Sequence, residues 1–246
     1  MKNIKSFIVS KLSDSQIDRL KWLGGNFKAY FAKRRNVGKN TYIEPSVHVL
    51  GWGNVKIGEN SVIGQDTTIV INKREPGKVS VIIGDNCFIG RRNFLTAGGL
   101  IKIGDYAMIS NDCRILGSGH LFDTPFMPYI ATGTTCDDVI ELGANCWLGA
   151  NTTLLKGVKV GYGSIIGAGS VVNCDIPPCS VVVGNPSRIV KRFDMQSQTW
   201  VKAKDYPEDS DKYIPSEAEY LEILKKKCPT TRMPIIAVSK TLGDLE

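Results

Sequence analysis

Aliphatic residues recur at every sixth position through the second half of this 246-residue chain. From residue 142 to residue 172 the repeat does not slip, and a small or β-branched residue follows four positions after most of the aliphatic ones. A period of six fits neither a helical face, whose period is about 3.6, nor the alternation of a single strand. It is typical of short strands that are separated by tight corners and stacked as a parallel β-helix. The aliphatic positions of this run are Leu142, Leu148, Leu154, Val160, Ile166 and Val172.

The same frame occurs upstream in three shorter runs, which begin at Ile57, Ile83 and Ile103. We expect the aliphatic residue of each rung to point inward, where it stacks on its equivalent in the next coil. Glycine and asparagine should form the corners, because they tolerate backbone conformations that other residues resist. The small interior positions include Cys87, Asn93, Cys113 and Cys146, and the repeat is interrupted at residues 70–80, 96–100 and 117–138.

Two stretches extend the repeat into a family signature, "CWLGANTTLLKGVKVGYGSIIGAGSVV" and "IPPCSVVVGNPSRIVKRF". With them the chain resembles the left-handed β-helix hexapeptide-repeat acyltransferases of the sugar and polysaccharide O-acetyltransferase type, over roughly residues 40–193. The resemblance implies an all-β solenoid of left-handed coils, three rungs to a coil, and assembly as a homotrimer. We therefore expect a β-helix domain at 37–193, with its catalytic loop at 117–138.

Both ends of the chain lie outside the repeat. Residues 1–36 have helix-like apolar spacing and are expected to form one or two short helices before the solenoid. Residues 194–246 form a C-terminal extension. Within it, Ser216 and Glu219 predict a capping box for a helix over 217–227, which would have lysines in its last turn.

The net charge of +7 is concentrated at the N-terminus. Residues 1–36 hold nine Lys or Arg and two Asp, while the remainder holds 22 basic and 22 acidic residues. This segment is either a solvated basic helix or a contact with a polyanion or an anionic membrane face. The longest apolar runs are too short to span a membrane, no signal peptide is apparent, and the seven cysteines include no CxxC pair. These features favour a cytoplasmic protein, with peripheral membrane contact through the N-terminus and no nucleic-acid partner.

His120 is the candidate catalytic base. It follows the strand "ISNDCRIL" and the turn "GSGH" at the start of a long loop, which is the context of the catalytic histidine in the resembled family. Histidine suits proton removal from an acceptor, because its ordinary pKa of ~6.5 leaves it partly neutral near pH 7. Asp112, Asp123 or a backbone carbonyl are the groups expected to orient it. The other histidine, His48, is expected to be a surface or packing residue.

The resemblance also suggests an acceptor site. Asn93 lies near the position of an asparagine that binds the acceptor hydroxyl in sugar acetyltransferases, although a corner-forming role is an equal alternative. Arg91 and Arg92 lie beside it and could contact an acidic sugar. Trp147 matches a family tryptophan and should project outward between inward-facing neighbours, where it needs a cover from a neighbouring subunit, the His120 loop or the pantetheine arm.

The acyl donor implied by the family is acetyl-CoA. Its pantetheine arm is expected to run along small residues between coils, and its phosphates need cations. A solvated basic terminus is the alternative for those cations. The residues expected to bind the donor are Trp147, Ala150, Ala168, Asn173, Arg188, Lys191 and Arg192.

Three other functions are alternatives for a chain of this pattern. A zinc carbonic anhydrase of this fold requires three histidines, and the chain has two, so we expect no metal. A non-catalytic scaffold or glycan-binding subunit would not need His120. N-acetylation of a nucleotide-linked amino sugar stays open beside the preferred function, which is O-acetylation of a capsular or lipopolysaccharide glycan containing sialic or uronic acid. Cys136 is the only thiol expected to be exposed.

Overall fold

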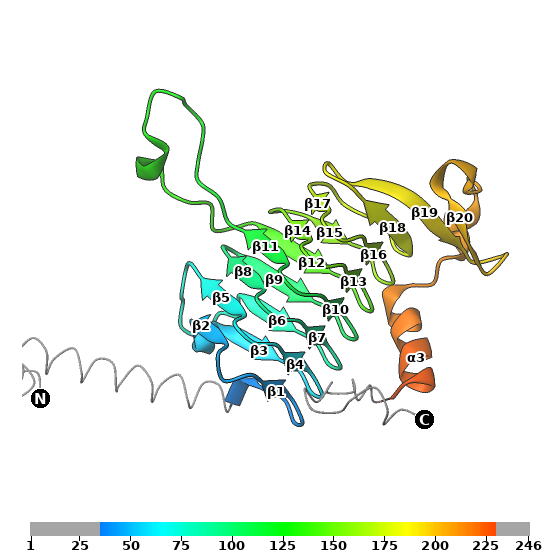
Figure 1. The fold of residues 1–246 in the computed structure, drawn as a ribbon, viewed down its shortest axis with the longest axis horizontal. Coiled ribbons are helices and arrows are strands. Elements are labelled where there is room, and N and C mark those ends of the chain that lie inside the picture. The colour runs from blue at the N-terminus through cyan, green and yellow to red at the C-terminus, as the bar shows by residue number, and fades with distance from the viewer. Residues whose placement is uncertain (1–34, 230–246) are drawn as a thin grey trace, which may run out of the picture.

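The computed structural model describes residues 35–229, which form a three-sided prism of short stacked strands with a C-terminal extension (Figure 1). Each turn of the chain contributes one strand to each of three sheets, and successive coils pair in parallel. The five-stranded sheet holds β3 (Val55–Ile57), β6 (Val81–Ile83), β9 (Leu100–Ile103), β12 (Val139–Leu142) and β15 (Lys159–Val160). The six-stranded sheet holds β2 (His48–Leu50), β5 (Thr68–Ile71), β8 (Phe94–Ala97), β11 (Arg114–Gly117), β14 (Thr153–Leu154) and β17 (Val171–Val172).

The nine-stranded sheet forms the third face and continues past the prism. Its parallel strands are β1 (Tyr42–Ile43), β4 (Val62–Ile63), β7 (Phe88–Ile89), β10 (Met108–Ile109), β13 (Trp147–Leu148), β16 (Ile165–Ile166) and β18 (Ser180–Val183). Two antiparallel strands, β19 (Arg188–Asp194) and β20 (Thr199–Lys202), then extend it. The all-β solenoid predicted from the repeat is confirmed, and it is a left-handed parallel β-helix.

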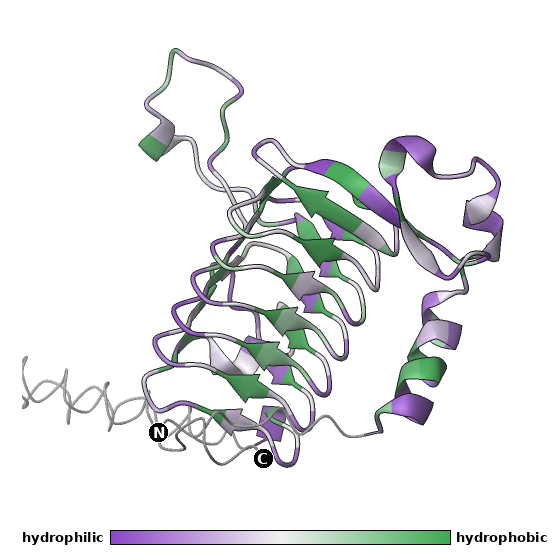
Figure 2. Ribbon diagram, turned by 45° about the vertical axis from the view of Figure 1, so that its right-hand side comes forward, coloured by the Kyte–Doolittle hydropathy of each residue, from purple (hydrophilic) through white to green (hydrophobic). Residues whose placement is uncertain are grey.

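The period-six positions build the core. From Ile57 onward, the aliphatic residue of each rung is at most 4% exposed and stacks in register on the next coil. The small residue four positions later is also buried, as expected for Cys87, Cys113 and Cys146. Figure 2 shows the apolar strands that line the prism. His48 is exposed on β2, so it is a surface residue.

A residue with left-handed backbone closes the corner from the five- to the nine-stranded sheet in every coil, and the corner from the nine- to the six-stranded sheet in the coils after the first. At the former corner these are Asn40, Asn60, Asn86, Tyr106, Asn145, Gly163 and Cys179, and at the latter they are Asp66, Arg92, Asp112, Asn151 and Gly169. Asparagine, aspartate and glycine tolerate this conformation best, which explains their spacing of six.

All three interruptions of the repeat emerge at the remaining corner, between the six- and five-stranded sheets. Residues 72–80 follow β5, and residues 118–138 follow β11 as a loop that projects from the prism and includes the short helix η2 (Tyr129–Ala131) (Figure 1). The predicted interruption at 96–100 is smaller than expected, because β8 and β9 continue through all of it except Gly98 and Gly99. A further short helix, η1 (Trp52–Asn54), occupies the same corner.

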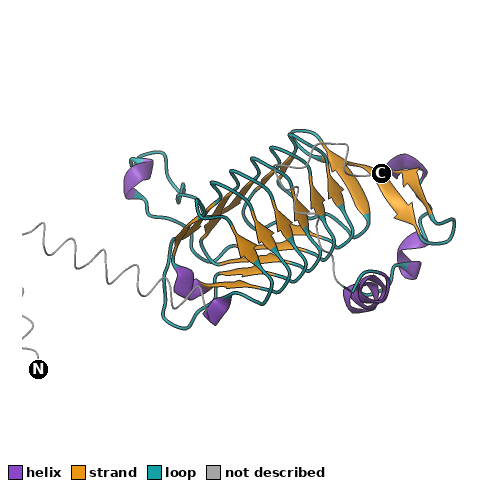
Figure 3. Ribbon diagram, turned by 60° about the horizontal axis from the view of Figure 1, so that its bottom comes forward, coloured by secondary structure: helices purple, strands orange, loops and turns teal. Residues whose placement is uncertain are grey.

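The C-terminal extension folds back along the prism. After β20 come η3 (Ala203–Asp205), η4 (Ser210–Tyr213) and α3 (Glu217–Lys227), and α3 runs beside the corner from the five- to the nine-stranded sheet (Figures 1 and 3). The predicted capping box is confirmed, since the Ser216 hydroxyl accepts from the Glu219 amide and the Glu219 carboxylate from the Ser216 amide. Glu217 Oε1 accepts from the Ala144 amide at 2.7 Å, and Asn145 Nδ2 donates to the Tyr220 hydroxyl at 2.6 Å.

The predicted N-terminal helices fall on residues 1–36, almost all of which lie outside the described residues, as does the end of the C-terminal extension. Within residues 35–229, no helix has the length and apolar character needed to cross a lipid bilayer.

Candidate functional site

His120 lies at the foot of the projecting loop, in a narrow two-stranded neck. The chain leaves the prism through Gly117, Ser118 and Gly119 and returns through residues 133–138. His120 pairs with Thr134 in an antiparallel bridge, and the Thr135 amide donates to the Gly119 carbonyl at 2.7 Å. The backbone of His120 is therefore held at the corner where the loop leaves the six-stranded sheet.

Two glycines of "TAGGL" make room for this neck. A methyl group on Gly98 would lie 2.5 Å from the Gly117 carbonyl oxygen and 2.9 Å from that of Thr135. A methyl group on Gly99 would lie 2.6 Å from the Asp138 carbonyl oxygen. The loop strands thus pass directly over the backbone of the preceding coil, and only glycine permits that approach.

No side chain of the described residues is hydrogen-bonded to the His120 imidazole, which is exposed. Asp112, one of the two carboxylates proposed to orient it, belongs instead to a corner of the prism. There it accepts a bidentate pair of bonds from Arg92, both at 2.8 Å, and the guanidinium lowers the pKa of that carboxyl. Asp123 is exposed farther along the loop. The prediction for Asp112 is therefore wrong.

The three residues predicted at 91–93 to bind the acceptor have different surroundings, because each lies at a different position of the repeat. Asn93 is 1% exposed, and its Oδ1 accepts from the Cys113 amide at 2.7 Å inside the prism. Its side chain therefore does not face a ligand, and the left-handed corner residue is Arg92. Arg92 is neutralised by Asp112, whereas Arg91 is exposed at the corner. Phe94, 38% exposed, is the residue that faces outward from the six-stranded sheet here.

Trp147 projects outward as predicted, 43% exposed between buried Cys146 and Leu148. Its indole Nε1 donates to Ser110 Oγ at 3.5 Å. The indole lines a groove of ≈ 680 Å³ between the outer face of the nine-stranded sheet and the C-terminal extension. The groove is mainly apolar, and its other lining side chains include Phe88, Met108, Ile165, Phe193, Trp200, Tyr220 and Ile223.

Three of the predicted donor-binding residues share one edge of the prism, the corner from the nine- to the six-stranded sheet. Ala150 and Ala168 occupy equivalent places in successive coils and are exposed. Arg188 opposes Val183 at the end of β18, in the register of the same edge. The three form a strip of small side chains with one free cation at its end. Asn173 is exposed one corner farther on, after β17.

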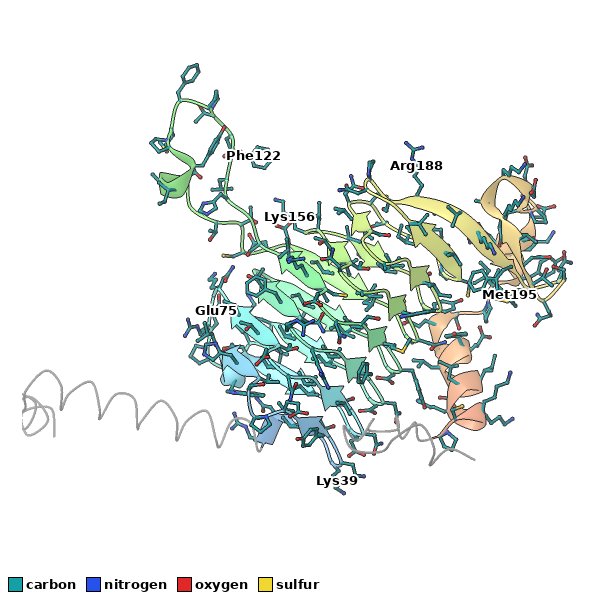
Figure 4. All side chains as sticks on the ribbon, in the orientation of Figure 1. Lys39, Glu75, Phe122, Lys156, Arg188 and Met195 are labelled. Carbon is teal, nitrogen blue, oxygen red and sulfur yellow. The ribbon has the colours of Figure 1, made fainter. Side chains whose placement is uncertain are left out.

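Arg192 differs from the other two cations. Its side chain is 11% exposed, and it bonds Asp211 at 2.7 Å and lies over the Tyr206 ring at 4.5 Å. It opposes Ser180, so it lies at the other end of β19 from Arg188. Figure 4 shows Arg188 far from Met195, which follows that end of the strand. Arg192 stabilises the C-terminal extension and is not available to a phosphate, whereas Arg188 and Lys191 are exposed.

The strip of small residues and His120 border opposite edges of the six-stranded sheet. The four residues of β11 separate them, which corresponds to about 13 Å at a strand rise of about 3.3 Å per residue. Proton transfer requires about 3 Å between heavy atoms. Within one chain, a group bound beside Ala150 and Ala168 therefore lies too far from His120 for direct transfer.

Some residues near His120 were not predicted. Ser118, Asn72 and Thr96 are hydrogen-bonded to one another at the foot of the loop. Lys156 lies beside Gly119 and pairs with Asp138 at 3.6 Å (Figure 4). Only the position of Ser118, between two glycines directly before His120, carries a sequence signal for such a role.

The thiols differ from expectation in one respect. Cys174 and Cys228 are exposed and Cys136 is half-buried, so the prediction that Cys136 is the only exposed thiol is wrong. Burial raises the pKa of both Cys87 and Cys146 to about 12. Among residues 35–229, no three His, Cys, Asp or Glu side chains gather as a metal site would require.

Two stretches of the chain match known repeat families. Residues 140–174 match the family described as bacterial transferase hexapeptide (six repeats), and residues 80–112 match the hexapeptide repeat of succinyl-transferase. The galactoside O-acetyltransferase of Escherichia coli (strain K12) is 29% identical over 174 residues, which are 71% of each chain. In its repeats and in this relative, the chain is similar to the hexapeptide-repeat acyltransferases.

Other proteins show the same similarity. A putative acetyltransferase of Staphylococcus aureus (strain COL) is 53% identical over 55 residues, which cover 22% of this acyltransferase and 28% of the relative. Among solved structures, a mutant of AntD, an N-acyltransferase from Bacillus cereus in complex with dTDP and coenzyme A, has a TM-score of 0.55 and 25% identity. That alignment covers 65% of this chain and 85% of AntD.

Proposed function

We propose that this acetyltransferase moves the acetyl group of acetyl-CoA to a hydroxyl of a carbohydrate. The observation that carries the proposal is the loop at 117–138, which presents the exposed side chain of His120 on a hydrogen-bonded two-stranded neck at a corner of the β-helix. A relative that resembles the chain over 71% of its length is a galactoside O-acetyltransferase. AntD, which shares the fold, is described with bound coenzyme A.

His120 would act as general base. Its neutral imidazole accepts the proton of the acceptor hydroxyl while the hydroxyl oxygen attacks the thioester carbonyl carbon. The tetrahedral intermediate then expels the CoA thiolate, which takes up a proton, so the products are an O-acetyl ester and free CoA. Attack is direct and requires both substrates at once, because the residue at hand is a base and not a nucleophile.

We further propose that the enzyme works as a homotrimer in which His120 of one subunit serves the donor edge of the next. The separation of about 13 Å across β11 supports this sharing. The loop supports it as well, since Phe122, Phe126 and Ile130 are 72%, 95% and 89% exposed. Apolar surface of this extent is expected to be covered by a partner. The apolar groove beside Trp147 offers a complementary surface.

The acceptor we favour is a bacterial surface glycan, of capsule or lipopolysaccharide type, with sialic or uronic acid residues. Because Asp112 neutralises Arg92, the cationic part of this proposal now depends on Arg91 and on the nine basic residues of the N-terminal segment. At low salt, anionic glycans should be acetylated faster than neutral glycans. The two rates should become equal as the salt concentration rises, because salt screens the charges. Equal rates at low salt would remove the anionic preference.

The second candidate is N-acetylation of a nucleotide-linked amino sugar, because AntD is an N-acyltransferase crystallised with dTDP. The two reactions give different products. An ester is cleaved by mild hydroxylamine, whereas an amide survives. NMR of the isolated product identifies the acetylated atom in either case.

The decisive experiment measures CoA release with acetyl-CoA and a panel of glycans and amino sugars. His120→Ala should lower kcat about 10²–10⁴-fold, the usual contribution of a positioned base. His48→Ala is the matched control, because His48 is an exposed histidine on β2. Equal activity of the two variants would refute the role of His120.

We also propose a cytoplasmic enzyme with peripheral contact to the inner membrane face through residues 1–36, whose net charge is +7. Sedimentation with anionic vesicles, reversed by salt and lost when those residues are neutralised, would support the contact.

A further inference from the structure

The chain leaves the prism toward His120 through the tripeptide Gly117–Ser118–Gly119. Glycines have the widest backbone freedom, so a pair of them flanking one residue is a natural hinge. The side chain of Ser118 is the only one in this tripeptide that can fix it to the prism. The 18 residues that follow His120 to Asp138 are largely exposed, so the position of the base depends on how its neck is attached.

Ser118 is attached to two preceding coils through a ring of hydrogen bonds. Asn72 Nδ2, just past β5, donates to Ser118 Oγ at 2.6 Å. Ser118 Oγ lies 3.2 Å from Thr96 Oγ1 on β8, and Thr96 Oγ1 donates to Asn72 Oδ1 at 3.5 Å. A consistent direction runs from the Asn72 amide to the Ser118 hydroxyl, from there to the Thr96 hydroxyl, and back to the Asn72 carbonyl oxygen. In this direction each of the three side chains both donates and accepts a hydrogen bond within the ring.

The contact is specific to the place where the loop departs. β5, β8 and β11 are neighbours in the six-stranded sheet, and Thr96 is in register with Leu116. The ring therefore ties the first loop residue to the ends of the two strands below it. The returning strand of the neck is attached differently, by the Leu100 amide, which donates to the Asp138 carbonyl at 3.2 Å. A Lys156–Asp138 ion pair at 3.6 Å, with both side chains partly exposed, contributes little.

We propose that Ser118, Asn72 and Thr96 are positioning residues that lock the Gly117–Gly119 hinge and so fix the imidazole of His120 over the six-stranded sheet. The catalytic part of this inference rests on the proposed function, in which His120 is the base. The mechanical part, that the ring restrains the neck, does not. A base displaced by about 1 Å can cost up to about a hundredfold in rate.

The test compares Ser118→Ala with Thr153→Ala, a control on the outer face of the same sheet whose hydroxyl makes no hydrogen bond among the described residues. Ser118→Ala should lower kcat about tenfold, in line with the loss of about one hydrogen bond, and leave the KM for acetyl-CoA unchanged. Ser118→Thr restores a hydroxyl and should recover most of kcat. Thr96→Val should lower kcat less, because Asn72 still holds Ser118.

Hydrogen exchange separates this inference from the proposed function. The amides of Leu121 and Thr135, which bond across the neck, should exchange faster in Ser118→Ala and not in Thr153→Ala. If His120→Ala proves fully active but this exchange still increases, the base assignment fails and the hinge lock stands. Unchanged exchange and unchanged kcat in Ser118→Ala would overturn the proposal, as would a kcat loss that Ser118→Thr does not recover.

Discussion

The two ends of β19 predict opposite effects for two arginines that look equivalent in the sequence. Arg188 is exposed at the edge that carries Ala150 and Ala168, with no bonded acid among the described residues. Arg192 is 11% exposed and engaged by Asp211. If the 3′-phosphate of CoA binds at that edge, Arg188 is the one of these two arginines that can contact it.

The magnitudes follow from these surroundings. A hydrogen bond to a charged group contributes about 1.5–3 kcal/mol, and exposure of Arg188 favours the lower value. Arg188→Ala should therefore raise the KM for acetyl-CoA about tenfold with little change in kcat. Arg192→Ala removes an ion pair with one well-exposed partner and a cation–π contact to Tyr206 at 4.5 Å. Together these contribute about 1–2 kcal/mol of stability, equivalent to a Tm lowered by about 2–8 °C.

Initial-rate kinetics with acetyl-CoA and with its 3′-dephospho form, together with thermal melts, measure both effects. The native enzyme and Arg192→Ala should prefer the phosphorylated donor, and Arg188→Ala should not distinguish the two. Lys56→Ala, an exposed lysine on the five-stranded sheet, is the charge-matched control. An unchanged KM in Arg188→Ala, or a tenfold rise in Arg192→Ala at unaltered Tm, would refute the reasoning.

Three further predictions concern the scaffold. In urea unfolding, Asn145→Ala should lower the free energy of unfolding about 1 kcal/mol more than Asn145→Gly does. Both variants lose the hydrogen bond to Tyr220, but only alanine resists a φ of 54°. Equal losses in the two variants would argue against strain at this corner. Gly98→Ala should lower kcat while leaving the circular dichroism of the prism intact, because its methyl group would displace the neck. Cys87 and Cys146 should resist thiol reagents until the chain unfolds. Because their pKa is raised from 9.0 to about 12 in the folded chain, the free energy of unfolding should fall as pH rises from 9 toward 12.

The fold could be predicted because the β-helix repeats one local rule. Each rung needs an inward aliphatic residue, a corner and a small buried residue, and each coil packs only against its neighbours. A period-six pattern therefore specifies the core without long-range information. The outward direction of Trp147 follows from the same rule, since buried Cys146 and Leu148 flank it. The capping box at Ser216 is equally local.

The predictions for individual side chains are wrong where a residue's role depends on its position within the repeat or on a partner distant in sequence. Asn93 sits at the buried fourth position after Ile89, so its side chain points inward although its neighbours Arg91 and Phe94 face outward. Arg192 is buried by Asp211 and Tyr206, which reach it from a segment without any repeat. A repeat pattern in the sequence cannot predict contacts with a segment that lies outside the repeat. The ring at Ser118 was missed for the same reason, since Asn72 is 46 residues away.

The placement of added length at one corner explains how the scaffold can carry a catalytic loop. At the other two corners a residue with left-handed backbone recurs from coil to coil after the first, and these residues form two columns along the stack. Insertions at the third corner leave both columns intact, so residues 72–80 and 118–138 disturb neither the register nor the buried core. In the coil after the loop, Gly157 closes this corner tightly at a φ of 79°. The faces beside Ala150 and Ala168 are thus left free of insertions, as a long, thin donor requires.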